Sequence, residues 1–297
     1  MRSEIERRVR VDDGTELRSW RRTHSGATRE RRGLLLVSGL LGHVDVFAAL
    51  EEALDDSWDV CTWQLRGSDR TAGVPDVDLA RHAADGLEVL RSHGLQGTVV
   101  LGWSTGAPVA AEMVSVAPGA FAGFVSVCGV FGGPVGRVIR RWLSGAADAG
   151  PVALGVGAAV ARGWRLPGWL AETTRSRVAL AGLRATGLVG ECTDPRAIGD
   201  LLARFARVEA GLVAASWSAL LDHLAQAPRV EIALPSLWLA GARDPLAGPM
   251  VAQLASASAS AAEFHTIPGG GHLLPLEQPE LLALRLQRWA ERLPPPG

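Results

Sequence analysis

The sequence predicts an α/β fold, with a mostly parallel central sheet covered by helices on both faces and an inserted helical cap. Short apolar runs alternate with amphipathic helical segments up to about residue 130, a rhythm typical of parallel sheets. The rhythm stops after Phe131, where helical runs continue without a convincing strand, and it resumes near residue 234. We therefore expect a core formed by residues 1–130 and 228–297, interrupted by a helical cap at 131–227.

The elements before the insertion can be assigned in chain order. The first 24 residues are expected to form a hairpin around the turn DDGT, with an Arg-rich, solvated face between Arg18 and Arg32. Apolar runs bounded by turn residues predict strands at 33–39, 58–67, 98–104 and 121–130. Apolar residues at helical spacing predict helices at 43–56, 78–94 and 105–116.

The remaining elements lie in and after the insertion. Asp194 followed by Pro195 predicts a helix start, because aspartate caps free N–H groups and proline suits the first helical position. Two further strands are expected at 234–241 and 262–269, followed by a closing helix at 276–293. The sequence shows no internal repeat.

Composition excludes several classes of function. The formal net charge of −1 gives no reason to expect nucleic acid as a partner. All 30 basic residues are arginine, so no lysine can form a Schiff base or bind phosphate in a P-loop. No apolar run approaches the roughly 20 residues that a membrane span needs, and because the N-terminal stretch is charged we expect no secretory signal there. We expect a cytoplasmic protein without an integral membrane segment, and composition leaves its oligomeric state open.

The three cysteines are Cys61, Cys128 and Cys192, and no two of them are closely spaced. Cys61 and Cys128 lie in apolar strand-like runs, where a buried, inert thiol is the common outcome. The chain has neither the ligand spacing of a zinc site nor a dinucleotide-binding glycine fingerprint. We therefore expect no metal and no cofactor.

Ser104 stands between Gly102 and Gly106 where an expected strand gives way to an expected helix. That context is typical of a nucleophile elbow, a strained turn that holds a serine hydroxyl clear of the sheet, although a simple small-residue turn would look similar. Acyl transfer at a serine also needs a base, an acid that orients the base, and donors for the oxyanion. Asp244 and His272 follow the two strands after the insertion, at the strand ends where open α/β sheets place functional groups.

Each of these residues has a simpler explanation when taken alone. Asp244 would also suit an Asx turn, and a histidine in a loop is usually only a surface residue. Asp200 and Asp222, in expected cap helices, are the alternative acids. His43 is expected to begin a surface helix, and His265 to lie within a strand.

Five segments, correctly ordered and spaced, resemble the α/β-hydrolase superfamily, and more narrowly its cap-bearing esterase, lipase and lactonase-like members. They are VSGLLGHVDVF, LRGSDRT, GWSTG, GARDPL and GGGHLLPLEQPE. The order Ser104, Asp244, His272 is the nucleophile, acid and base order of that family. The resemblance implies that the backbone N–H groups of Leu40 and Thr105 form the oxyanion hole.

The sequence departs from the family pattern at two positions. Ser38 stands where the family commonly has histidine, which affects the hydrogen bonding that shapes the oxyanion loop. Asp69 stands where glycine is usual, and an extra carboxylate near the site could disfavour anionic substrates. A solvated loop aspartate is the simpler interpretation of Asp69.

Tryptophans gather at the elbow and in the insertion, at Trp103, Trp142, Trp164, Trp169 and Trp217. Most will pack in the core, but apolar helices over a serine site favour a hydrophobic substrate. We therefore predict a cofactor-free serine hydrolase that cleaves a small carboxylic ester with a lipophilic acyl or aromatic part through an acyl-enzyme. A lactonase, a C–C hydrolase, an acyltransferase or a cofactor-free haloperoxidase are the enzymatic alternatives. A ligand-binding module with vestigial chemistry is the alternative outside enzymes.

Overall fold

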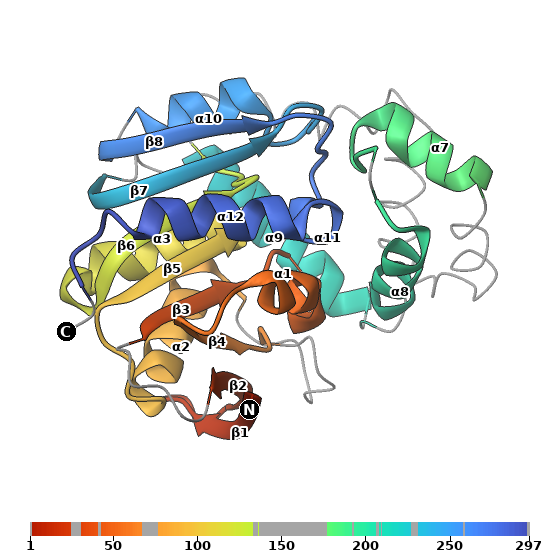
Figure 1. The fold of residues 1–297 in the computed structure, drawn as a ribbon. Helices are drawn as coiled ribbons and strands as arrows, with labels where there is room; N and C mark the ends of the chain where they lie inside the picture. Colours follow the sequence, from red (N-terminus) through yellow and green to blue (C-terminus); the bar gives the residue numbers. More distant parts are fainter. Residues whose placement is uncertain are drawn as a thin grey trace.

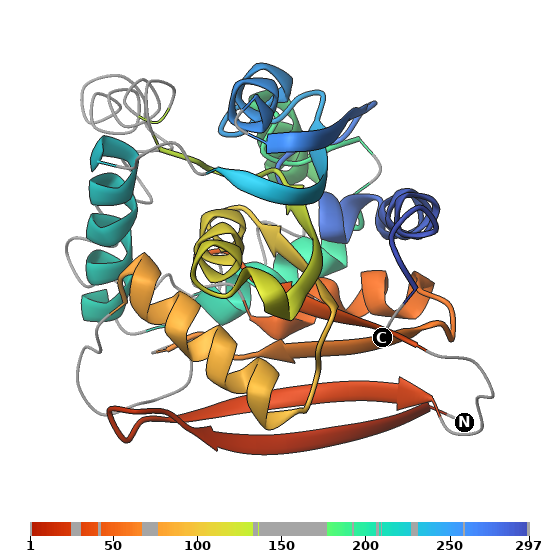
Figure 2. The same ribbon diagram turned by 90° about the vertical axis from the view of Figure 1, so that its left-hand side faces the viewer.

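The structure is a computed structural model. It describes residues 2–24, 31–40, 43–66, 77–132, 136, 177–191, 193–205, 208, 210–226, 231–257 and 259–295. Within these ranges the chain forms one eight-stranded sheet with helices on both sides, seen from two directions in Figures 1 and 2. The predicted α/β class is confirmed.

The sheet has the strand order β1-β2-β4-β3-β5-β6-β7-β8. The strands are β1 (Arg2–Arg10), β2 (Glu16–His24), β3 (Arg32–Val37), β4 (Trp58–Trp63), β5 (Thr98–Trp103), β6 (Phe121–Val127), β7 (Ile232–Gly241) and β8 (Ala259–Ile267). The β1–β2 hairpin joins β4 in antiparallel pairing, and every pairing from β4 to β8 is parallel. The carboxyl ends of the parallel strands from β4 to β8 therefore meet at one edge of the sheet, where loops from distant parts of the chain converge.

The helices are η1 (Val44–Phe47), α1 (Ala48–Ala53), α2 (Leu79–Ser92), α3 (Gly106–Val116), η2 (Pro118–Ala120), α7 (Arg177–Thr186), α8 (Pro195–Phe205), α9 (Ala210–Gln226), α10 (Pro249–Ser256), α11 (Leu274–Glu277) and α12 (Pro279–Ala290). Central strands are buried on both faces, as parallel sheets require. In β3, Leu34 and Leu36 pack in the apolar layer under α1 and α12, whereas Leu35 and Val37 pack against α2 and α3. None of the helices in the described ranges is long and apolar enough to cross a bilayer.

Several predicted boundaries are wrong in instructive ways. β6 ends at Val127 rather than residue 130, because the backbone turns at Cys128, whose φ is 48°. The closing helix is split into α11 and α12, since Pro279 begins α12 and cannot continue the preceding helix. The Arg-rich face is only partly solvated, because Arg21 pairs with Asp59 at 2.6 Å in the partly buried region between β2 and β4.

The chain between β6 and β7 leaves and re-enters the sheet at neighbouring strands. Its described helices are α7, α8 and α9, and α7 and α8 lie beyond the carboxyl edge of the sheet (Figure 1). Asp194 starts α8 as predicted, and its Oδ1 accepts the Arg196 N–H at 2.9 Å. Residues 137–176, which include much of the predicted cap, lie outside the described residues.

Candidate active site

Ser104 lies in a tight turn between β5 and α3. Its φ is 57°, a left-handed conformation that is unfavourable for serine and marks a strained turn. A β-carbon at Gly102 would lie 2.3 Å from the Gly106 carbonyl oxygen, and one at Gly106 would lie 2.2 Å from the Val37 carbonyl oxygen. Glycine is therefore required on both sides of Ser104, because a side chain at Gly102 would collide with the start of α3, and one at Gly106 would collide with the end of β3.

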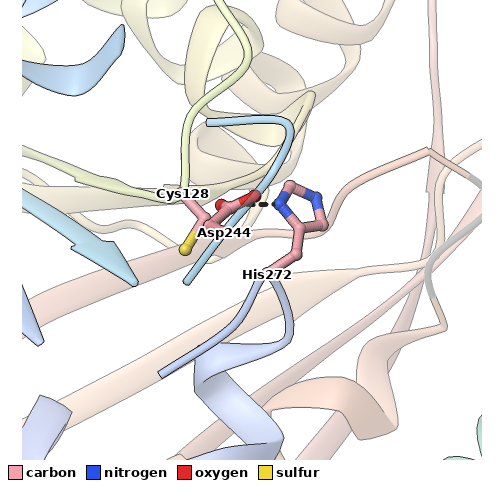
Figure 3. Close-up of side chains that lie close together, drawn as sticks. All are labelled: Cys128, Asp244 and His272. Atoms are coloured by element: carbon pink, nitrogen blue, oxygen red, sulfur yellow. Dashed lines mark hydrogen bonds and ion pairs between the residues drawn. The ribbon is translucent and has the colours of Figure 1, made fainter. Parts of the chain in front are cut away.

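A chain of hydrogen bonds joins Ser104, His272 and Asp244. The Ser104 Oγ lies 2.9 Å from His272 Nε2, and His272 Nδ1 lies 2.9 Å from Asp244 Oδ2. Figure 3 shows the contact between His272 and Asp244, which come from the loops after β8 and β7. The three residues are only 6–8 % exposed. The structure thus brings together three residues from distant parts of the sequence in the arrangement that a nucleophile, its base and an orienting acid require.

Asp244 is held in its ionised form. Burial acts to raise the pKa of its carboxyl group, but the nearby His272 ring and backbone N–H donors outweigh this effect, and the pKa is lowered. Its Oδ1 accepts the N–H groups of Leu246 at 2.8 Å and Ala247 at 3.0 Å, which leaves Oδ2 for His272. The Asp244 carboxylate is therefore fixed in orientation from both sides.

Cys128 lies beside this pair, as Figure 3 shows. Its thiol Sγ, a carboxylate oxygen of Asp244 and a ring nitrogen of His272 all lie within 4.8 Å of one another. Burial raises the pKa of the thiol well above its usual value, and the neighbouring Asp244 charge acts in the same direction. A protonated thiol is a poor metal ligand, and His272 and Asp244 already bond each other, so the arrangement favours proton transfer over metal binding.

His272 is supported by contacts that the sequence did not reveal. The Trp103 indole N–H donates to the His272 carbonyl oxygen at 2.8 Å, and the two rings lie 5.9 Å apart. The His272 N–H donates to the carbonyl oxygen of Leu188, in the connection between α7 and α8, at 3.2 Å. Glu277, which follows in α11, accepts the N–H groups on either side of His272. Glu277 lies within the segment GGGHLLPLEQPE, but nothing in the sequence alone indicates these contacts.

A cavity of about 190 Å³ opens onto Ser104 and His272. Among the residues that the structure describes, the lining apart from Ser104, Thr105 and His272 is apolar and comprises Leu40, Trp103, Val130, Leu201, Trp217, Leu220, Leu246 and Leu273. Thr105 and Leu40, the predicted oxyanion donors, therefore border the cavity. The loop that carries Leu40 passes close to the elbow, because a β-carbon at Gly39 would lie 2.8 Å from the Ser104 β-carbon.

The other predicted site residues are distributed as follows. Trp103 and Trp217 line the cavity, whereas Trp142, Trp164, Trp169 and Asp69 lie outside the described residues. Ser38 is buried just after β3. The alternative acids, Asp200 on α8 and Asp222 on α9, are both exposed. As predicted, His43 lies at the start of a helix, where it caps η1, and His265 lies within a strand, β8.

The sequence and the fold are similar to those of known hydrolases. The family described as alpha/beta hydrolase fold matches residues 34–279. Solved structures with the same fold include an esterase from Thermogutta terrifontis (19 % identity, 98 % of both chains covered, TM-score 0.68) and an esterase from Exiguobacterium antarcticum (14 % identity, 97 % of this chain and 100 % of the other, TM-score 0.72). Est816, an enzyme that degrades N-acyl homoserine lactones, is 17 % identical over 95 % of this chain and 99 % of its own, with a TM-score of 0.69.

Sequence comparison with curated proteins gives no significant match. The family match nevertheless spans both halves of the sheet, from β3 to the start of α12, and includes Ser104, Asp244 and His272. The chain belongs to the α/β hydrolase fold family.

Proposed function

We propose that this protein is a serine hydrolase that cleaves carboxylic esters with a lipophilic acyl part. The observation that carries the proposal is the hydrogen-bonded chain from Ser104 through His272 to Asp244, which opens into a cavity with apolar walls. The chain supplies a nucleophile and its base, and the walls favour an apolar substrate.

In the proposed reaction His272 Nε2 takes the Ser104 proton as Oγ attacks the ester carbonyl carbon. Asp244 keeps the His272 proton on Nδ1 and stabilises the imidazolium that forms. The backbone N–H groups of Leu40 and Thr105 donate to the oxyanion. His272 then passes its proton to the leaving alcohol, the acyl group remains on Ser104, and water activated by His272 releases the acid.

We further propose that the connection between β6 and β7 forms a cap that roofs the site. Leu201 of α8 and Trp217 and Leu220 of α9 line the same cavity as Leu40 on the core side. Each additional methylene of the acyl chain that is buried there should contribute about 0.8 kcal/mol, or roughly fourfold in kcat/KM, until the cavity is full. The protein should therefore prefer medium acyl chains over acetyl.

Two experiments test these steps. Ser104→Ala should abolish labelling by a fluorophosphonate probe and reduce p-nitrophenyl ester hydrolysis by about 10⁶, with the fold intact by circular dichroism. Activity within tenfold of wild type would contradict the mechanism. A series of p-nitrophenyl esters from acetyl to octanoyl then measures the chain-length preference.

Trp217→Ala should flatten that preference, because the ring lines the cavity. Met250→Ala is the matched control, since Met250 is 71 % exposed on α10 and is not among the lining residues. Equal rates for acetyl and octanoyl esters, unchanged by Trp217→Ala, would exclude the lipophilic roof and favour a small polar ester or a lactone.

A further inference from the structure

Glu277 is a buried carboxylate that takes no part in the proton transfers described above. It is 5 % exposed, at the end of the short helix α11. Its Oε2 accepts the Gly271 N–H at 2.7 Å, and its Oε1 accepts the Leu273 N–H at 3.1 Å. These are the two residues that flank His272, so one side chain holds the backbone on both sides of the proposed base.

Burying the Glu277 carboxylate costs desolvation free energy, which backbone hydrogen bonds offset in part. Burial raises the pKa of Glu277, while backbone N–H groups and the nearby His272 ring act in the opposite direction. A leucine or methionine would fill the same space without a desolvation penalty. Only an acceptor with two oxygens can satisfy N–H groups on both sides of His272.

The connection between α7 and α8 packs against the same carboxylate. The Gly190 N–H is a third backbone donor to Glu277, and a β-carbon at Gly190 would lie 2.3 Å from Glu277 Oε2. Nearby, the Leu188 carbonyl oxygen accepts the His272 N–H at 3.2 Å, and the Glu191 N–H donates to the Gly269 carbonyl oxygen at 3.1 Å. Residues 188–191 therefore lie along the His272 loop, with Glu277 bonded to both.

The loop itself needs such support. Three consecutive glycines, Gly269 to Gly271, precede His272, and Gly269 has a φ of 69°. Glycine offers the greatest backbone freedom of any residue, so this loop gains little rigidity from its own sequence. The ring must nevertheless keep Nε2 within reach of Ser104 while Nδ1 stays on Asp244.

We propose that Glu277 is a positioning residue that fixes His272 and couples it to residues 188–191 of the insertion. The proposal rests on the proposed function, in which His272 is the base. Since a misplacement of about 1 Å can cost about 100-fold in rate, loss of this clamp should lower kcat far more than it raises KM. Because Gly190 contacts the Glu277 carboxylate, a change at Gly190 should also displace His272 and lower kcat.

The test uses the full chain with p-nitrophenyl butyrate and a fluorophosphonate probe. Glu277→Gln keeps the shape of the side chain but turns one oxygen into an NH₂ group that faces a backbone N–H donor. We expect kcat to fall about 10- to 100-fold, KM to change by less than about threefold, and labelling of Ser104 to slow in parallel with kcat. Glu280→Gln removes an exposed carboxylate three residues away and should match wild type.

Gly190→Ala disturbs the Glu277 carboxylate from the side of the insertion, and it provides a second test if Glu277→Gln fails to fold. Its control is Gly182→Ala on α7, where an added β-carbon meets nothing within 4 Å. Gly190→Ala should lower kcat, and the double variant with Glu277→Gln should be hardly worse than the more affected single variant.

Two results would overturn the proposal. If both single variants keep kcat and labelling within about twofold of wild type, Glu277 does not position His272. If their effects multiply fully in the double variant, the two residues act independently and the coupling is wrong. Failure of the proposed function is distinguishable from both results, because it would appear as residual hydrolysis in Ser104→Ala.

Discussion

Asp244→Asn tests the proposed acid with a change of only one atom. Asp244 Oδ1 accepts two backbone N–H groups, so the amide oxygen of asparagine must take that place, since an NH₂ group there would face two donors. The NH₂ group then faces His272 Nδ1, 2.9 Å away in the wild type. Because an amide nitrogen only donates, Nδ1 must give up its proton, and the proton moves to Nε2.

This tautomer cannot accept the Ser104 proton, because the nitrogen that faces Oγ already carries one. A change of this kind costs about 10⁴ in turnover, or about 5.5 kcal/mol in the activation barrier. KM should change little, since Asp244 does not line the cavity. The assay is steady-state hydrolysis of p-nitrophenyl butyrate, with Asp222→Asn on the exposed face of α9 as the matched control.

The same variant predicts an effect on acid unfolding. The pKa of Asp244 is lowered in the folded protein, so its carboxylate contributes stability above the unfolded pKa of about 3.9, and that stability is lost as the pH falls. The unfolding free energy of Asp244→Asn should therefore depend less on pH in the acid range. Turnover within tenfold of wild type for Asp244→Asn, or a crippled Asp222→Asn, would refute the assignment of the acid.

Three further predictions follow from buried groups. Gly106→Ala places a β-carbon 2.2 Å from the Val37 carbonyl oxygen and should cost about 1–3 kcal/mol by urea unfolding, so an unchanged midpoint would contradict the tight elbow. Burial raises the pKa of Cys61 to about 12 and that of Cys128 well above its usual value, so peptide mapping should find both thiols free of iodoacetamide adducts in the native protein and modified in denaturant. Burial lowers the pKa of His93 to about 4, so as the pH falls the histidine is protonated in the unfolded chain before it is protonated in the folded protein. The free energy of unfolding should therefore fall as the pH drops from about 6.5 to about 4, and His93→Gln should reduce this dependence on pH.

The sequence was most informative where local chemistry determines structure. Alternating apolar and helical segments predicted the parallel sheet, because each strand of such a sheet is buried on both faces. Once strand ends were assigned, the shared edge of the sheet implied that Ser104, Asp244 and His272 would meet, and their side chains lie within hydrogen-bonding distance. Their catalytic roles stay a prediction until the variants are measured.

Contacts between distant backbone segments could not be predicted from the sequence. The approach of residues 188–191 to the His272 loop depends on how the insertion folds back, and it uses carbonyl and N–H groups that every residue carries. The hydrogen bond from Trp103 to the His272 carbonyl oxygen was missed for the same reason. Cys128 was expected inside a strand, but the strand ends one residue earlier, and the thiol comes to lie beside Asp244.

The separation of the site residues along the chain has a consequence for biosynthesis. Ser104 and His272 are 168 residues apart, and β5 can pair with β3 long before β7 and β8 have left the ribosome. At about 5–20 residues per second, roughly 8 to 34 s pass between synthesis of the serine and synthesis of the histidine. During that interval the nascent chain would carry the serine on its turn without a base, so the proposed hydrolase would stay inert until translation has passed His272.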